Sequence, residues 1–147
     1  MVGPGTGAAP FRGFLWERYV ASKTSAMAQT IFYYGCRHPD NDRLYKNEFD
    51  EIGKQDWVSI KNAFSRNGGK KVYVQQLVKE DCDLVWDILE NRKGVFYVCG
   101  DAKNMATAVY ATLVEVAMIK NGLDEEGGKE WVKRLKSGGR YLEDTWS

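Results

Sequence analysis

The sequence predicts an α/β fold: a doubly wound, mainly parallel sheet flanked by helices. Strand-like and helix-like segments alternate along the 147 residues, which is the order that a parallel sheet requires. The run Gly94-Val95-Phe96-Tyr97-Val98-Cys99-Gly100 is uninterrupted by charge, as expected of a parallel strand covered on both faces. Near the start, Gly3, Gly5 and Gly7 precede a helical pattern, which is typical of a phosphate-binding turn.

The N-terminal half alternates between the two kinds of segment. Met1-Val2 is expected to be the last step of a first strand that is otherwise missing, because such glycine turns follow a strand. From Pro10 the apolar residues have helical spacing. Residues 30–35 are β-branched and aromatic and end at glycine, which predicts a buried strand. A helix is expected over 44–52 and another strand over 58–64.

The C-terminal half continues the alternation. Residues 70–75 are too short a segment to assign, and a helix is expected over 83–89, extending back to 76–78. The strand over 94–100 is followed by Asp101 as a candidate N-cap of a long helix that Gly122 ends. A further helix is expected over 125–136 and a short strand over 141–147. The carboxyl ends of such strands form the ligand-binding edge of the sheet.

Composition excludes several classes of function. The net charge of +1 gives no overall field to attract nucleic acid or an anionic membrane. No apolar run is long enough for a membrane span. The three cysteines are scattered, there is one histidine, and no Cys-x-x-Cys or His-x-x-x-His spacing occurs, so neither a disulfide framework nor a metal site is expected. Any anion-binding site must therefore be local.

Six motifs, in order, carry a resemblance to a known family. The chain resembles the NADPH-binding domain of the diflavin reductases, and within them most resembles the NADPH–cytochrome P-450 reductases. The motifs run from the first residue to the last: Gly3-Pro4-Gly5-Thr6-Gly7 with Ala9-Pro10-Phe11-Arg12, Tyr34-Gly35-Cys36-Arg37, Ala63-Phe64-Ser65-Arg66, Lys71-Val72-Tyr73-Val74-Gln75, Tyr97-Val98-Cys99-Gly100-Asp101-Ala102, and Asp144-Thr145-Trp146-Ser147. The resemblance implies a ferredoxin-NADP reductase-like domain over residues 1–147. This domain would be the C-terminal part of a larger flavoprotein whose FMN and FAD domains are absent here.

The resemblance assigns the phosphates of NADPH to two sets of residues. Four side chains would bind the 2′-phosphate, with Gln75 nearby: Ser65, Arg66, Lys71 and Tyr73. Their hydroxyl, guanidinium, ammonium and phenol groups are the charge-assisted donors that this dianion needs, although the same residues also suit a solvated turn. The glycine turn with Gly5, Thr6 and Gly7 would face the pyrophosphate and nicotinamide, and Arg37 would meet the pyrophosphate.

The nicotinamide end is assigned to residues from the last two strands. Cys99 would lie beside the hydride-carrying carbon and, with Asp144, tune hydride transfer to the flavin. Asp101 and Met105 would line the same pocket, although the residues alone equally suit an N-cap and a core position. Trp146 would stack on the FAD ring and move aside for nicotinamide. From chemistry alone Cys99 is a small buried apolar residue, and no base is at hand to make it a nucleophile.

The implied function is hydride transfer from NADPH to FAD, followed by electron transfer through FMN to a heme protein such as a cytochrome P-450. Its partners would be the FAD and FMN domains of the parent chain, on the cytoplasmic face of the endoplasmic reticulum if the parent carries an N-terminal anchor and in the cytoplasm otherwise. One alternative is a diflavin reductase that serves an iron–sulfur protein, a sulfite reductase or methionine synthase. The other is a truncated, non-catalytic nucleotide-binding module.

Overall fold

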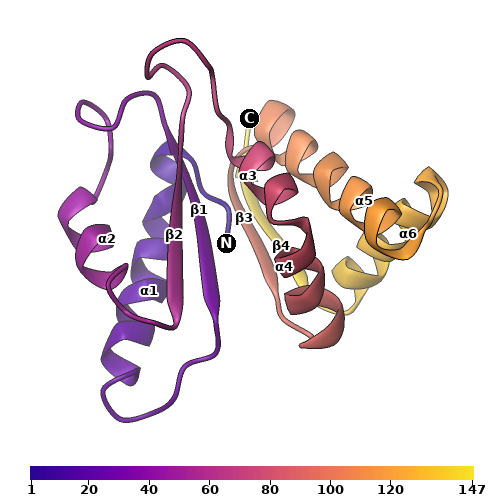
Figure 1. The fold of residues 1–147 in the computed structure, drawn as a ribbon, viewed down its shortest axis with the longest axis horizontal. Helices are drawn as coiled ribbons and strands as arrows, with labels where there is room; N and C mark the ends of the chain where they lie inside the picture. Colours follow the sequence, from indigo (N-terminus) through magenta and orange to yellow (C-terminus); the bar gives the residue numbers. More distant parts are fainter. The chain divides into compact units, whose positions relative to one another are not determined.

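The computed structural model describes residues 1–147, which form two compact units (Figure 1). The first unit is Met1–Val74 and the second is Gln75–Ser147. Each unit contains a pair of parallel strands with helices packed against it. This arrangement confirms the predicted α/β class. The two units are described separately.

The first unit begins with the glycine turn. A 3-10 turn, η1 (Gly5–Ala8), leads into α1 (Ala9–Ala21). The strands β1 (Thr30–Cys36) and β2 (Val58–Phe64) pair in parallel, with α2 (Lys46–Ile52) between them in sequence. Val2 forms a parallel bridge with Tyr33 on β1, as expected of the last step of a strand.

Aromatic side chains fill the core of the first unit. Phe32 of β1 lies 5.6 Å from Phe11 of α1 and 5.2 Å from Phe49 of α2, ring centre to ring centre. Residues 31–35 are buried throughout, which is why β1 shows no polar alternation in sequence. A carboxylate also joins the two helices, because Glu48 accepts hydrogen bonds from Arg12 Nε at 2.7 Å and Trp16 Nε1 at 2.5 Å.

The helix predicted over 44–52 begins later than expected, at Lys46. Tyr45 has a left-handed backbone (φ 55°), which keeps it and Leu44 outside the helix, although their apolar side chains fit its pattern. The Leu44 amide donates to the Tyr34 hydroxyl at 2.8 Å.

The second unit contains the remaining elements. The helices are α3 (Val74–Glu80), which starts at the last residue of the first unit, α4 (Cys82–Trp86), α5 (Thr107–Asn121) and α6 (Glu125–Ser137). Two wider π-type turns are η2 (Asp87–Asn91) and η3 (Ala102–Ala106). The strands β3 (Phe96–Asp101) and β4 (Tyr141–Trp146) pair in parallel.

Three boundaries in the second unit test the sequence predictions. The expected helix over 76–89 is interrupted at Asp81, whose dihedrals leave the helical region (φ −91°, ψ 23°). The strand begins at Phe96 rather than Gly94, because the Gly94 amide donates to Ile88 O at 2.7 Å and closes the preceding turn. Gly122 ends α5 with a left-handed backbone (φ 62°), as predicted.

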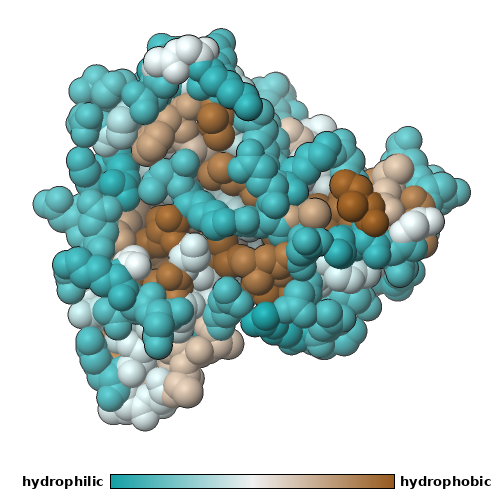
Figure 2. Space-filling model, viewed as in Figure 1, coloured by the Kyte–Doolittle hydropathy of each residue, from teal (hydrophilic) through white to brown (hydrophobic).

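The face seen in Figure 2 is mostly hydrophilic, with hydrophobic residues showing between hydrophilic ones. The most exposed large apolar side chains are Val20 in α1 and Ile119 in α5, at 67% and 59%. Such isolated residues are ordinary on a folded domain. None of the helices combines the length and the apolar character that crossing a bilayer requires.

Candidate functional site

The glycine turn lies against the carboxyl end of β1. The Gly3 amide donates to Tyr33 O at 3.1 Å and the Gly7 amide to Pro4 O at 3.0 Å. A Cβ atom on Gly3 would lie 2.5 Å from Gly7 O, and one on Gly35 would lie 3.0 Å from Pro4 Cβ. The turn therefore has no room for a side chain at Gly3 and little at Gly35, while Thr6 remains exposed.

Backbone hydrogen bonds extend the β1–β2 pair past the ends of both strands. The Ser65 amide donates to Cys36 O at 3.0 Å, and the Arg66 amide donates to Arg37 O at 2.8 Å. Arg37 and Arg66 are thus neighbours just beyond the carboxyl end of β1, the end near which the glycine turn is bonded.

The chain then reverses and returns to the same edge. Gly68 and Gly69 both have positive φ, 57° and 75°, a conformation that glycine adopts without strain. The Val72 amide donates to Phe64 O at 3.1 Å. Because of this hydrogen bond, Lys71 and Tyr73 flank a residue that is paired with the end of β2, next to Ser65 and Arg66. The structure therefore brings the four expected phosphate ligands to one edge of the first unit.

Positive charge at this edge is only partly neutralised. The side chains of Arg66, Lys70 and Lys71 are exposed and form no ion pair with a carboxylate. Arg37 pairs with Asp42 at 3.1 Å, and its side chain is 65% exposed. Tyr73 is 46% exposed. Gln75, the other expected contact, lies in α3 at the first position of the second unit.

Cys99 and Asp144 are direct neighbours in the second unit. They stand opposite each other in the parallel register of β3 and β4. Cys99 is 3% exposed. Burial raises the pKa of its thiol, and the Asp144 carboxylate raises that pKa further. The thiol is therefore protonated at neutral pH, which agrees with the expectation that it is not a nucleophile.

Asp101 and Trp146 form the next pair in the same register. The Asp101 carboxylate accepts hydrogen bonds from the Asn104 amide at 2.7 Å and the Met105 amide at 3.2 Å, so its predicted role as an N-cap is confirmed. Hydrogen bonding from Asn104 and then Met105 lowers the pKa of Asp101. The Trp146 side chain remains 46% exposed at the end of β4. The expected nicotinamide contacts thus gather at the carboxyl ends of β3 and β4.

Comparison with known proteins agrees with this geometry. Residues 1–111 match the family described as the oxidoreductase NAD-binding domain. The chain belongs to this family. The matched part of this NAD-binding domain includes the glycine turn, the β1–β2 edge and Cys99, whereas Asp144 and Trp146 lie beyond it.

Individual relatives of this NAD-binding domain are longer proteins. It is 44% identical over 148 residues to the NADPH–cytochrome P450 reductase of Drosophila melanogaster, 41% over 148 residues to that of Musca domestica, and 48% over 152 residues to that of Aspergillus niger. Each match covers 100% of this chain and 22% of the relative. The NAD-binding domain therefore spans about a fifth of the length of these relatives.

Sequence reasoning missed one residue at the edge of the NAD-binding domain. Asp42 accepts hydrogen bonds from the backbone amides of Arg37 and His38 and from the Arg37 side chain. The available signal was an aspartate in the loop after a strand, a residue type that often accepts hydrogen bonds from nearby backbone amides. Most loop aspartates are solvated, so the residue type alone does not single it out.

Proposed function

We propose that this chain binds NADPH and presents its nicotinamide to FAD for hydride transfer. The observation that carries the proposal is the hydrogen bond from the Val72 amide to Phe64 O. It gathers Ser65 and Arg66 with Lys71 and Tyr73, although a glycine-containing loop separates them in sequence. Membership in the NAD-binding family supports a dinucleotide as the ligand of this edge.

The unpaired cations at this edge favour NADPH over NADH. A 2′-phosphate carries close to two negative charges and binds best to guanidinium and ammonium donors. Arg66 and Lys71 have no carboxylate partner that would compete with a phosphate. Ser65 and Tyr73 add hydroxyl donors. A plain ribose hydroxyl would leave these charges without a counterion.

The remaining site residues serve the other parts of the cofactor in this proposal. Gly5, Thr6, Gly7 and Arg37 contact the pyrophosphate side, and Gln75 lies near the 2′-phosphate.

Cys99, Asp101, Met105 and Asp144 surround the nicotinamide, and Trp146 covers the FAD ring until nicotinamide replaces it. The buried, protonated Cys99 thiol and the neighbouring Asp144 carboxylate act by packing and electrostatics, while the cofactors carry the hydride chemistry.

The parent protein extends the proposal beyond this chain. The relatives are named NADPH–cytochrome P450 reductases, so we assign the chain to a flavoprotein of this type, with FAD and FMN domains as intramolecular partners. Electrons would pass through FMN to a heme protein such as a cytochrome P450. Such a parent would work at the cytoplasmic face of the endoplasmic reticulum membrane if it carries an N-terminal anchor, and in the cytoplasm otherwise.

Nucleotide titration tests the proposed phosphate site directly. Adenosine 2′,5′-bisphosphate is expected to bind more tightly than 5′-AMP in calorimetric titrations. Arg66→Ala is expected to weaken NADPH binding by about 1.5–3 kcal/mol, the range for a hydrogen bond to a charged group, and to leave NADH binding nearly unchanged. Arg134→Ala, which removes an exposed arginine from α6, is the control for the loss of one charge. Equal affinities for the two adenosine nucleotides would overturn the proposal.

A further inference from the structure

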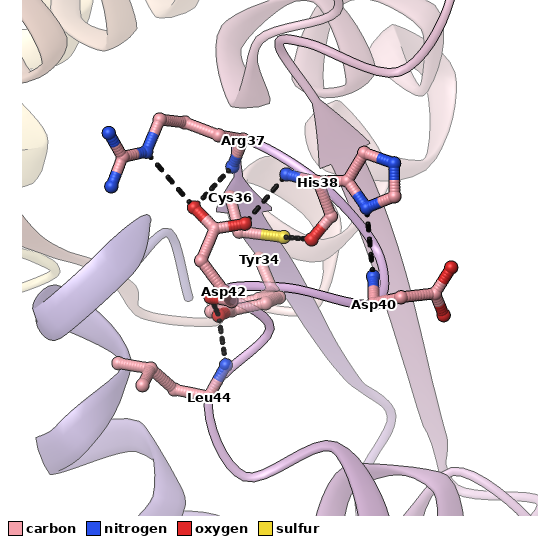
Figure 3. Close-up of polar contacts among 7 residues, drawn as sticks. All are labelled: Tyr34, Cys36, Arg37, His38, Asp40, Asp42 and Leu44. Carbon is pink, nitrogen blue, oxygen red and sulfur yellow. Dashed lines mark hydrogen bonds and ion pairs between the residues drawn. The ribbon is translucent and has the colours of Figure 1, made fainter.

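The loop that follows β1 is organised around the carboxylate of Asp42 (Figure 3). One oxygen, Oδ1, accepts from the His38 amide at 2.6 Å. The other, Oδ2, accepts from the Arg37 amide at 3.0 Å and from Arg37 Nε at 3.1 Å. A single side chain thus binds two consecutive backbone amides and the guanidinium that follows β1.

This arrangement fixes Arg37 without using its whole guanidinium. Only Nε donates to Asp42, and Figure 3 shows the two terminal nitrogens of Arg37 turned away from the carboxylate. These terminal groups carry the paired donors with which arginine binds phosphate oxygens. Asp42 therefore orients the side chain while leaving its phosphate-binding donors available.

The position of Asp42 is itself tied to β1. The buried Tyr34 hydroxyl accepts from the Leu44 amide at 2.8 Å and lies 3.5 Å from Asp42 O. Cys36 Sγ donates to His38 O at 3.4 Å. These contacts anchor the loop on both sides of Asp42. Hydrogen bonding from the His38 amide, the largest cause, lowers the pKa of Asp42, so the carboxylate is ionised at neutral pH.

We propose that Asp42 is a positioning residue that holds Arg37 ready for the pyrophosphate of the bound dinucleotide. The inference rests on the proposed function, since it takes the β1–β2 edge as the binding site. An exposed arginine otherwise loses side-chain freedom when a ligand binds. A carboxylate near a phosphate also repels it. If Asp42 positions Arg37, removing Asp42 should weaken NADP⁺ binding; if Asp42 is only a counter-charge, removing it should strengthen NADP⁺ binding.

The test compares two ligands on the chain and its Asp42→Ala variant. NADP⁺ contains a pyrophosphate, whereas adenosine 2′-monophosphate contains only the phosphate assigned to Ser65, Arg66 and Lys71. Asp42→Ala is expected to weaken NADP⁺ binding about three- to tenfold, the range for one side chain that must be ordered on binding, and to leave adenosine 2′-monophosphate binding unchanged. Asp40→Ala removes a carboxylate of the same loop that pairs only with Lys46 and is the matched control.

A double-mutant cycle and a milder variant separate positioning from loss of folding. In an Arg37→Ala background, Asp42→Ala is expected to have no further effect on NADP⁺ binding, because the two residues act as one unit. Asp42→Asn retains an oxygen for a backbone amide and is expected to show a smaller loss in the same direction, which keeps the test decisive if Asp42→Ala does not fold.

Three results would overturn the inference. Tighter NADP⁺ binding by Asp42→Ala would make Asp42 a counter-charge, and equal losses for both ligands would make it a general support of the loop. Unchanged NADP⁺ binding would show that Asp42 has no role in binding this ligand. In each case wild-type selectivity for adenosine 2′-monophosphate over adenosine would leave the proposed function intact, whereas its absence would overturn both.

Discussion

The Tyr34 hydroxyl holds two residues of the following loop in place. Tyr34 is fully buried on β1, and burial raises its pKa to about 12. Its oxygen accepts from the Leu44 amide at 2.8 Å. This contact ties the end of the loop to β1, just before the left-handed Tyr45 that precedes α2.

Replacing Tyr34 by phenylalanine is expected to lower the free energy of unfolding by about 0.5–1.5 kcal/mol, because the Leu44 amide loses its partner. Tyr45→Phe is the matched control, since the Tyr45 ring packs on Phe49 and beneath Arg12 while its hydroxyl makes no hydrogen bond. That change is expected to stay within about 0.5 kcal/mol. Urea denaturation measures both, and equal losses would contradict the assigned role of the Tyr34 hydroxyl.

Asp101 makes stability depend on pH through its N-cap. Its pKa is lowered in the folded state, first by the Asn104 amide, relative to the ordinary value of about 3.9. A lowered pKa stabilises the fold above the unfolded-state pKa, and this contribution is lost as the pH falls through the folded-state pKa. The stability advantage over Asp101→Asn, which keeps a capping oxygen without the charge, should therefore shrink below about pH 4. An NMR titration that gives Asp101 an ordinary or raised pKa would refute this.

At the scale of elements, the glycine turn depends on close backbone packing. A Cβ atom on Gly3 would lie 2.5 Å from Gly7 O and 2.6 Å from a ring carbon of Phe11. Neither the backbone oxygen nor the buried ring has room to move, because Phe11 also packs on Phe32. The shape of the turn is thus set by the absence of a side chain at Gly3.

Gly3→Ala is expected to destabilise the chain by about 1–3 kcal/mol, the usual cost of overpacking. Gly13→Ala provides the contrast, because Gly13 lies in α1 with open space where a Cβ atom would be, and alanine there should stabilise the helix by about 0.5–1 kcal/mol. Thermal unfolding of the two variants measures the difference. A stable Gly3→Ala variant would mean that the turn has another conformation.

The elements were predictable where one periodic pattern covered them. β1, β2, α1 and α6 follow apolar patterns that local propensity supports, and the structure confirms them. The interruption at Asp81 and the late start of α2 were not predictable, because a change of one residue's dihedrals leaves the apolar pattern unaltered.

The residues of the candidate site were named from the resemblance, and their roles in binding stay predictions. Their assembly did not follow from the sequence. The proximity of Ser65 and Lys71 depends on the hydrogen bond between Val72 and Phe64. The residues between Ser65 and Lys71 show no helical or strand periodicity, so this contact could not be predicted from their sequence. Asp42 was missed for a similar reason, because its role depends on contacts with the start of its loop.

For the whole molecule, the proposed contacts divide between the two units. Residues assigned to the 2′-phosphate lie chiefly in Met1–Val74, whereas Cys99, Asp101 and Met105 lie in Gln75–Ser147. Each unit has its own strand pair: Ser65 and Arg66 follow the last residue of β2, and Cys99 and Asp101 lie at the end of β3. This division makes fragments of the cofactor useful as separate probes.

Adenosine 2′-monophosphate is expected to shift the backbone amide resonances of Ser65, Arg66 and Lys71 and to leave those of Cys99 and Asp101 unchanged. Nicotinamide mononucleotide is expected to do the reverse, because its ring has no contact among the 2′-phosphate ligands. Two-dimensional NMR titrations measure both patterns. Shifts at the same residues with both fragments would argue against the division of roles.

The burial of Cys99 also decides how the chain can be labelled. Maleimides attack thiolates, and burial raises the pKa of both the Cys99 and Cys36 thiols. A maleimide fluorophore is therefore expected to couple slowly at both of these cysteines, so labelling of the chain should spare Cys99, the cysteine assigned to the nicotinamide.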